Sequence, residues 1–230
     1  MGFGDLPERL SRVRQDIDRH REAGGWSHPV TIVAVTKGFG SEAVAAALAA
    51  GVVDIGENRV QEAVDKMAAA PSDRLRWHLI GHLQRNKAKV VPGKFALVHS
   101  LDSLELADEL ERRAAAMGVN VSVLVQVNMA REPQKSGCDP EAARELIRAL
   151  GSRAHLKVEG LMTMAPFTDD VDVQRRTFRG VRELRDSLQE EGVWLPILSM
   201  GMSGDYGTAV EEGATVVRLG TVLFGPRTTP

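Results

Sequence analysis

Lys37 ends an apolar, β-prone run of the sequence, TIVAVTK, at residues 31–37. Because side chains alternate between the two faces of a strand, the Lys37 amine shares a face with Val35 and Val33. An amine withdrawn from water favours its neutral form, and a neutral amine attacks a carbonyl carbon to form a Schiff base. The alternative is a lysine that extends past the strand end and pairs with a carboxylate on a helix.

Arg218 lies in a second apolar run, VVRLGTVLFG, at residues 216–225. A guanidinium group is costly to bury unless a partner accepts its hydrogen bonds. Arg218 could pair with a carboxylate such as Glu57 and have no other role. If it faces the lumen of a barrel, it could instead donate to the ring nitrogen of a ligand.

A stretch rich in glycine and small polar residues, GMSGDYGTAVEEG, contains a candidate anion site. Ser203 can donate its hydroxyl, Gly204 allows close backbone approach, and a helix beginning near Asp205 would direct its amides at an anion. In the adjoining run, Gly220 and Thr221 offer further backbone donors. The same residues are also typical of a structural turn with an ordinary helix cap.

An amine for an aldehyde, an anion site and an arginine for a pyridine nitrogen together predict pyridoxal 5'-phosphate as the ligand. The amine alone also fits a cofactor-free Schiff-base aldolase, which would need no phosphate site. His78 and His82 could share one face of a strand and bind a metal. No cysteine or carboxylate completes their ligand set, so we predict no metal site.

The chain alternates between β-prone runs and helical or loop spacers. This alternation predicts parallel strands of the α/β class, which most economically close into a single (β/α)8 TIM barrel. We expect one domain over residues 1–230, with an N-terminal helix at about 5–23; an open doubly wound sheet is the alternative. The eight predicted strands cover residues 31–37, 53–58, 76–83, 97–102, 121–128, 158–165, 197–202 and 216–225.

Catalytic and binding residues of such barrels lie at the carboxyl ends of the strands. This rule for the carboxyl ends places one set of polar residues at the rim: Lys37, Glu57, Asn58, His82, Gln84, Asp102, Asn128, Ser203 and Arg218.

Helices are predicted between the strands, at 41–51, 102–118, 139–150 and 170–191, with room for only a short helix between the third and fourth strands.

The charge balance favours a small-molecule ligand. The 29 basic and 31 acidic side chains leave a formal net charge of −2, which gives no general attraction to nucleic acid or to an anionic membrane. The single cysteine, Cys138, cannot form an internal disulfide, and the first residues lack an apolar signal segment. We therefore expect a cytoplasmic protein.

The sequence resembles the YggS/PROSC family of pyridoxal phosphate homeostasis proteins over nearly its whole length. The likeness is carried by AVTKG, GENRVQE, WHLIGHLQRNK, HSLDS, QVN, KSGC, GLMTMAP, LSMGMSGDY and VRLGTVLFGPR. It implies a barrel similar to the N-terminal domain of alanine racemases, without their C-terminal β-domain. Thr36, His82 and residues 204–206 depart from residues common in the family, but none of these departures removes a predicted ligand.

The resemblance implies that pyridoxal 5'-phosphate is held as an aldimine on Lys37, which would also be the residue of any catalysis. The implied cofactor site consists of Lys37, Asn58 near the ring, Arg218 on the pyridine nitrogen, and Met202, Ser203, Gly220 and Thr221 on the phosphate. Because an arginine cannot give a proton to the ring nitrogen, the cofactor would be a poor electron sink.

We therefore expect a protein that binds and buffers pyridoxal phosphate and related B6 vitamers, with delivery to apo-enzymes as a further hypothesis. The alternative is a weak amino acid racemase that uses Lys37 as one base. Tyr206 is interpreted as a packing residue rather than the opposite-face acid, and Lys135 as a residue that assists uptake or release. Since the chain ends at Pro230, shortly after the last strand, we expect a monomer.

Overall fold

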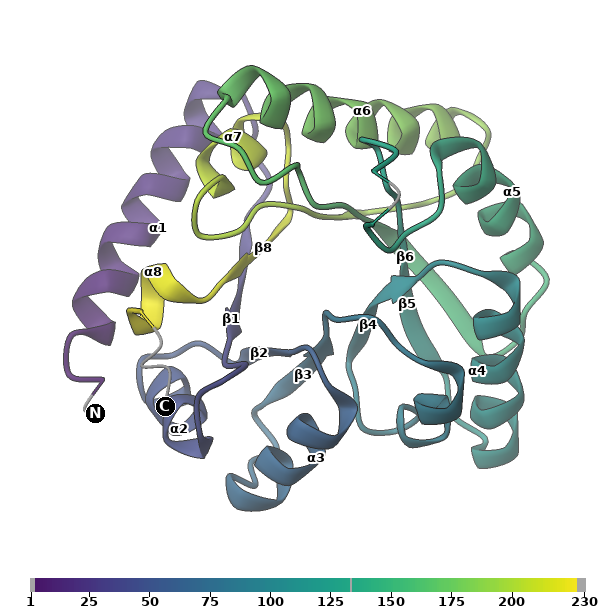
Figure 1. The fold of residues 1–230 in the computed structure, drawn as a ribbon, viewed down its shortest axis with the longest axis horizontal. Helices are drawn as coiled ribbons and strands as arrows, with labels where there is room; N and C mark the ends of the chain where they lie inside the picture. The colour runs from purple at the N-terminus through teal and green to yellow at the C-terminus, as the bar shows by residue number, and fades with distance from the viewer. Residues whose placement is uncertain (1–2, 133, 227–230) are drawn as a thin grey trace.

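The computed structural model describes residues 3–132 and 134–226, and its eight strands close into one parallel barrel in sequence order (Figure 1). β8 pairs with β1 to complete the ring, with Val33 opposite Arg218. The predicted (β/α)8 barrel is confirmed, and the open sheet is wrong. The strands are β1 (Thr31–Val35), β2 (Asp54–Glu57), β3 (Arg76–Leu79), β4 (Leu97–Leu101), β5 (Val121–Gln126), β6 (Leu156–Met162), β7 (Ile197–Ser199) and β8 (Val216–Leu219).

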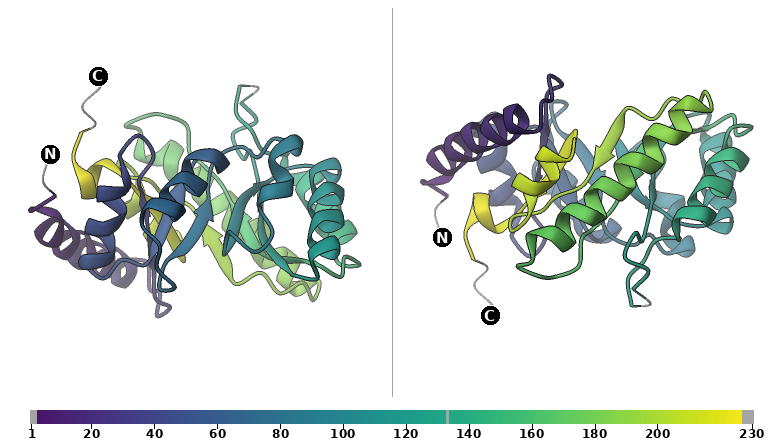
Figure 2. Two further views of the ribbon diagram at one scale, coloured as in Figure 1. Left: turned by 90° about the horizontal axis from the view of Figure 1, so that it is seen from below. Right: turned by 90° about the horizontal axis from the view of Figure 1, so that it is seen from above.

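Helices cover the outside of the barrel, and α1 packs beside α7 and α8 (Figure 1, Figure 2). Among residues 3–132 and 134–226, none of them combines the length and the apolar character needed to cross a bilayer. The helices are α1 (Leu6–Ala23), α2 (Ser41–Ala49), α3 (Val60–Ala69), the 3-10 helix η1 (Arg85–Val90), α4 (Leu104–Met117), α5 (Pro140–Leu150), α6 (Val171–Glu190), α7 (Tyr206–Glu211) and α8 (Thr221–Phe224).

Capping residues set the ends of several helices. The Ser103 hydroxyl accepts a backbone N–H at the start of α4, and Gly118 ends that helix in the left-handed region at φ 63°. At the start of α6, the Asp170 carboxylate accepts two backbone N–H groups. These ends lie within two residues of the predicted helices at 102–118 and 170–191. The predicted domain also includes residues 1–2, 133 and 227–230, which lie outside the described residues.

The predicted strands extend too far at their carboxyl ends. β1 ends at Val35 and β2 ends at Glu57, so Lys37 and Asn58 lie in the loops that follow. The apolar pattern continues past the last ladder hydrogen bond because these loop residues still contribute to the wall of the barrel. The rim of the barrel is therefore made of loops, on which functional side chains commonly lie.

The last predicted strand, residues 216–225, is wrong beyond Leu219, because the next segment forms the short helix α8. An unbroken apolar run does not distinguish a buried strand from a buried helix by its period. Packing decides here: the Phe224 ring lies edge-on to the Phe3 ring at 5.6 Å between centroids. The final helix therefore fills the space between the barrel and the start of α1.

The interior of the barrel is part apolar and part polar. One small buried cluster, separate from the main core between strands and helices, is formed by Leu97, Leu124 and Met162. Barrels of this kind usually fill their interior with branched apolar side chains. Here a second part of the interior holds buried polar residues instead: Asp54, His78, His99, Ser199 and Arg218.

Candidate functional site

A cavity of about 690 Å³ opens among the loops at the carboxyl ends of the strands. Its volume falls within the usual range of small-molecule sites, roughly 300–1,000 Å³. The loops after β1, β2, β3, β5, β6, β7 and β8 all contribute to the wall. All seven predicted site residues line this cavity: Lys37, Asn58, Met202, Ser203, Arg218, Gly220 and Thr221.

Lys37, in the loop after β1, lies on the lumen side of the barrel, as the alternation predicts. Val35 and Lys37 line the cavity, whereas Ala34 packs in the core between the strands and the helices. The side chain of Lys37 is partly buried. A primary amine is therefore placed in the wall of a pocket that can enclose a small molecule.

Some polar residues predicted at the rim lie outside the cavity wall. Asn128 binds its own loop, because its Nδ2 donates to the Glu132 carbonyl at 2.8 Å. His82 does line the cavity, and its Nδ1 lies 3.7 Å from a carboxylate oxygen of Asp102. The four predicted rim residues that do not line the cavity are Glu57, Gln84, Asp102 and Asn128.

Arg218 is 4% exposed and is held from inside the barrel. Its Nη1 donates to the Ser199 carbonyl and to the Ser199 hydroxyl, both at 2.8 Å, and its Nη2 donates to the Thr163 carbonyl at 3.0 Å. Burial lowers the pKa of Arg218 to about 10, which still leaves it a cation at neutral pH. A guanidinium group has more N–H donors than these contacts use, so donors remain for the cavity.

The alternative in which Arg218 pairs with Glu57 is wrong. Glu57 is the last residue of β2 and points to the opposite side of the strand, where its carboxylate accepts from Lys66 on α3 at 2.7 Å. Thr36 also donates its hydroxyl to this carboxylate. Burial raises the pKa of Glu57, although the hydrogen bonds from Lys66 and Thr36 act in the other direction.

A clamp from α3 fixes the backbone on both sides of Lys37. The Lys66 ammonium group donates to the Thr36 carbonyl at 2.8 Å and to Glu62 at 2.9 Å. Glu62 in turn accepts the Gly38 N–H at 3.0 Å. The sequence prediction missed Lys66 and Glu62 as supports of the site; the block GENRVQE, which contains Glu62, was the available signal.

Ser203 links the loop after β7 to the turn between β8 and α8. Its hydroxyl oxygen accepts the backbone N–H groups of Gly220 at 3.2 Å and Val222 at 3.3 Å. The hydroxyl hydrogen is not used by these contacts. The residues of the predicted anion site therefore come together from two loops, but the Gly220 N–H, predicted as a donor to the anion, is already bound by the Ser203 oxygen.

Asp205 lies on the same wall and brings a negative charge to it. Its carboxylate accepts the Met202 N–H at 2.5 Å, and burial raises its pKa. This carboxylate therefore occupies a backbone donor that an anion could otherwise use.

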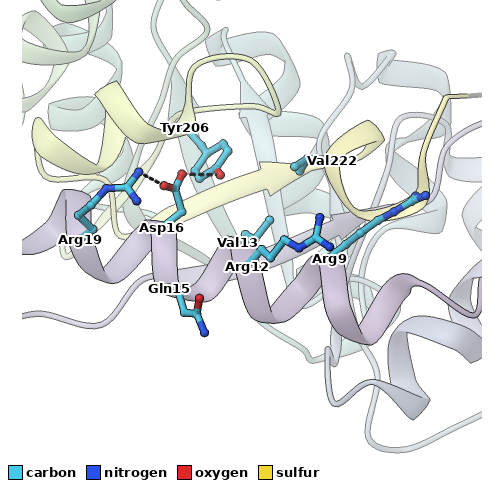
Figure 3. A pocket seen from close by; sticks show the side chains of 8 residues that line it. All are labelled: Arg9, Arg12, Val13, Gln15, Asp16, Arg19, Tyr206 and Val222. Carbon is cyan, nitrogen blue, oxygen red and sulfur yellow. Dashed lines mark hydrogen bonds and ion pairs between the residues drawn. The ribbon is translucent and has the colours of Figure 1, made fainter.

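Tyr206 faces a separate groove of about 380 Å³ between α1 and the α7 and α8 region (Figure 3). Its hydroxyl donates to Asp16 at 2.6 Å, and burial raises the pKa of the phenol. Arg19 reaches the same carboxylate from the next turn of α1.

The single cysteine, Cys138, also lies away from the site. Burial raises the pKa of its thiol to about 11, and Cys138 does not line the main cavity.

The two histidines considered as a metal pair lie in different surroundings. His78 is buried inside the barrel, whereas His82 is exposed at the rim. Within the described ranges, no group of three or more His, Cys, Asp or Glu side chains is placed to hold a metal ion.

The fold and the site first define a class. Residues 9–228 match the family model described as "Alanine racemase, N-terminal domain". An alanine racemase of Clostridium difficile superposes with a TM-score of 0.77 at 19% identity, over 98% of this chain and 60% of that one, which is a likeness of fold. The protein is a barrel of the alanine racemase N-terminal class.

Closer relatives define the family within that class. The pyridoxal phosphate homeostasis protein of Aquifex aeolicus is 44% identical over 222 residues, which are 96% of this chain and 97% of that protein. PipY of Synechococcus elongatus, solved with PLP bound, superposes with a TM-score of 0.86 at 36% identity, over 96% of this chain and 100% of that one. The chain belongs to the family of pyridoxal phosphate homeostasis proteins, as the resemblance implied.

Proposed function

We propose that the protein binds pyridoxal 5'-phosphate in the barrel cavity and serves as an intracellular reservoir of this cofactor. The observation that carries the proposal is the convergence of Lys37, the buried guanidinium of Arg218 and the Ser203 hydroxyl on one cavity of about 690 Å³. The relative solved with PLP bound supports the same ligand class.

The residues of the cavity fit the parts of this cofactor. When bound, the cofactor supplies an aldehyde carbon with which a primary amine forms a C=N bond as one water molecule leaves. Lys37 would supply that amine, and Arg218 would donate to the ring nitrogen. Asn58 would lie by the ring, and Met202, Ser203, Gly220 and Thr221 would hold the phosphate.

A reservoir is favoured over a racemase by the positions of the candidate acids. The chain has one tyrosine and one cysteine, and neither lines the cavity. Arg218 keeps its own protons at neutral pH, so it does not turn the ring into a strong electron sink. Turnover of chiral amino acids by the purified protein would favour the racemase instead.

Lys135 is proposed to control passage of the cofactor through the mouth of the cavity. It lines the cavity, donates to the Ala165 carbonyl in the loop after β6 at 2.9 Å, and forms an ion pair with Glu132. It thereby joins two loops over the site. An unchanged rate of transfer to an apo-enzyme in Lys135→Ala would reject this role.

The visible spectrum of Lys37→Ala, purified beside wild type, tests the proposal. Wild type should be yellow with bound cofactor, and borohydride should bleach it and fix the cofactor mass on the peptide that contains Lys37. Lys37→Ala should lose both properties. Lys89→Ala, an exposed lysine on η1, is the matched control and should behave as wild type. A reduced adduct on another lysine would overturn the assignment.

Size-exclusion chromatography tests the proposed monomer.

Delivery of the cofactor to apo-enzymes is tested by adding the loaded protein to an apo-enzyme and following recovery of that enzyme's activity. Recovery no faster than with the same concentration of free cofactor would leave a reservoir without a delivery role.

A further inference from the structure

A hydrogen-bonded chain crosses the interior of the barrel from the cavity to the opposite rim. Arg218 Nη1 lies 2.8 Å from the Ser199 hydroxyl, which lies 2.9 Å from His99 Nδ1. His99 Nε2 lies 2.9 Å from His78 Nδ1, and His78 Nε2 lies 2.9 Å from Asp54 Oδ1. These five residues come from five different positions on β2, β3, β4, β7 and β8.

The two ends of the chain determine its direction. Arg218 can only donate, and an ionised aspartate can only accept. Although burial raises the pKa of Asp54, hydrogen bonds from His78 and Arg76 hold it at about 2. Burial lowers the pKa of His99 well below its usual value, so this ring is neutral.

With both ends fixed and a single proton on His78, one arrangement of protons satisfies every contact. Arg218 donates to Ser199, whose hydroxyl donates to His99 Nδ1. His99 then donates from Nε2 to His78 Nδ1, and His78 donates from Nε2 to Asp54. In this arrangement both histidines are Nε2–H tautomers, and each bond points in the same direction, which strengthens its neighbours.

The chain also joins two ends of the molecule. Asp54 is the first residue of β2, at the rim opposite the cavity, where it pairs with the exposed side chain of Arg76 at 2.5 Å. Arg218 lies at the cavity. A cation that faces the ligand is thus linked to an anion at the far end of the barrel through the side chains of Ser199, His99 and His78.

We propose that Asp54, His78, His99 and Ser199 form a positioning chain that holds the Arg218 guanidinium in one orientation toward the ring nitrogen of the ligand. This inference rests on the proposed function, and it assigns a role to four residues that do not line the cavity. None of the four is a catalytic residue. A purely structural polar core would need no particular direction of its hydrogen bonds and no link to the ligand's nitrogen.

Nuclear magnetic resonance of protein labelled on histidine nitrogen tests the direction without any ligand. In cofactor-free wild type at about pH 7, both His78 and His99 should be neutral and carry the proton on Nε2. The signals are assigned from their loss in His78→Gln and His99→Gln. A proton on Nδ1 of either ring, or a charged His99, would overturn the chain.

Ligand binding tests the positioning role. Dissociation constants are measured for pyridoxal 5'-phosphate and for its analogue with carbon in place of the ring nitrogen. Ser199→Ala and Asp54→Asn should weaken the first ligand about fivefold and leave the second unchanged, because only the first receives the Arg218 donor. Ser199→Thr keeps the hydroxyl and should bind both ligands as wild type does.

Arg76→Gln is the matched control for Asp54→Asn. It removes the other partner of the same carboxylate but leaves the anion that accepts from His78, so neither binding constant should change. Equal weakening of both ligands in Ser199→Ala or Asp54→Asn would overturn the positioning role. If wild type bound neither ligand, the proposed function would fall, while the tautomers would still decide the direction of the chain.

Discussion

Lys66 forms three bonds with one buried ammonium group, to the Thr36 carbonyl at 2.8 Å, to Glu57 at 2.7 Å and to Glu62 at 2.9 Å. Lys66→Met keeps the length of the side chain but leaves Glu57 buried without its cation. Removing one partner of a buried pair costs about 3–5 kcal/mol. We expect the free energy of unfolding in urea to fall by about 3 kcal/mol.

The control for Lys66→Met is the double variant with Glu57→Gln, which removes the stranded charge. It should regain part of the lost stability, since its two changes act on one contact and are not additive. A single variant as stable as wild type would show that Lys66 does not hold the segment around Lys37.

Asp54 should make stability depend on pH at the acid end. Its pKa is about 2 in the folded protein and 3.8 as the usual value. The stabilisation of the fold by ionised Asp54 is therefore complete above pH 3.8 and is lost as the pH falls from 3.8 to about 2. It amounts to about 2 kcal/mol.

Unfolding free energies of wild type and Asp54→Asn, measured at several acid pH values, test this dependence. The difference in unfolding free energy between the two proteins should shrink as the pH falls from about 4 toward about 2. A gap that stayed constant would mean that Asp54 is not an anion held by His78 and Arg76.

Single residues were predictable where one rule placed them. The strand-end rule found Lys37 because a polar residue at the end of an apolar run is conspicuous, and Arg218 was found because a guanidinium group inside such a run needs a partner. It could not find His99, whose partners belong to β3 and β7. A histidine within an apolar run looks like any buried polar residue until the strands that face it are known.

At the scale of elements, the turn from β7 into α7 sets the charge of the proposed phosphate site. Asp205 precedes α7 without capping it through its side chain. Asp205→Asn keeps an oxygen for the Met202 N–H and removes a negative charge from the wall. We expect pyridoxal 5'-phosphate to bind about fivefold more tightly, and pyridoxal, which has no phosphate, to bind as before.

The gain from Asp205→Asn should shrink as the pH falls toward the Asp205 pKa, which burial raises, because wild type then loses the same charge. Asp169→Asn is the control, since Asp169 is an exposed carboxylate on the cavity wall and should change affinity less. Tighter binding of pyridoxal as well would point to a change of pocket shape instead of charge.

Elements were predictable where caps and periods agreed. Ser103 and Gly118 marked both ends of α4. The sequence did not reveal α3, because no conventional capping side chain precedes Val60. It also did not distinguish α8 from a continued β8, since the contacts of Phe224 with distant rings decide that segment.

At the scale of the whole molecule, α1 is attached through α7 to the side of the barrel that carries the proposed phosphate site. The Tyr206 hydroxyl donates to Asp16 at 2.6 Å (Figure 3). Tyr206→Phe should lower the free energy of unfolding by about 1–2 kcal/mol and leave the bound cofactor's spectrum unchanged. A changed spectrum with unchanged stability would contradict the packing role and revive Tyr206 as an acid.

The closed barrel itself was predictable from the number and spacing of the apolar runs. Eight parallel strands in one sheet leave two open edges unless the first and last strands pair. What the spacing could not supply was the polar part of the interior, because that depends on which side chains meet across the ring, such as Ser199 and His99.

The pairing of β1 with β8 also has a consequence for biosynthesis. Lys37 follows the first strand to leave the ribosome, and Arg218 belongs to the last, where it is registered against Val33. A nascent chain therefore holds the amine long before it holds the arginine and both loops of the predicted anion site. Binding of the proposed cofactor would have to wait until the whole barrel has been translated and closed.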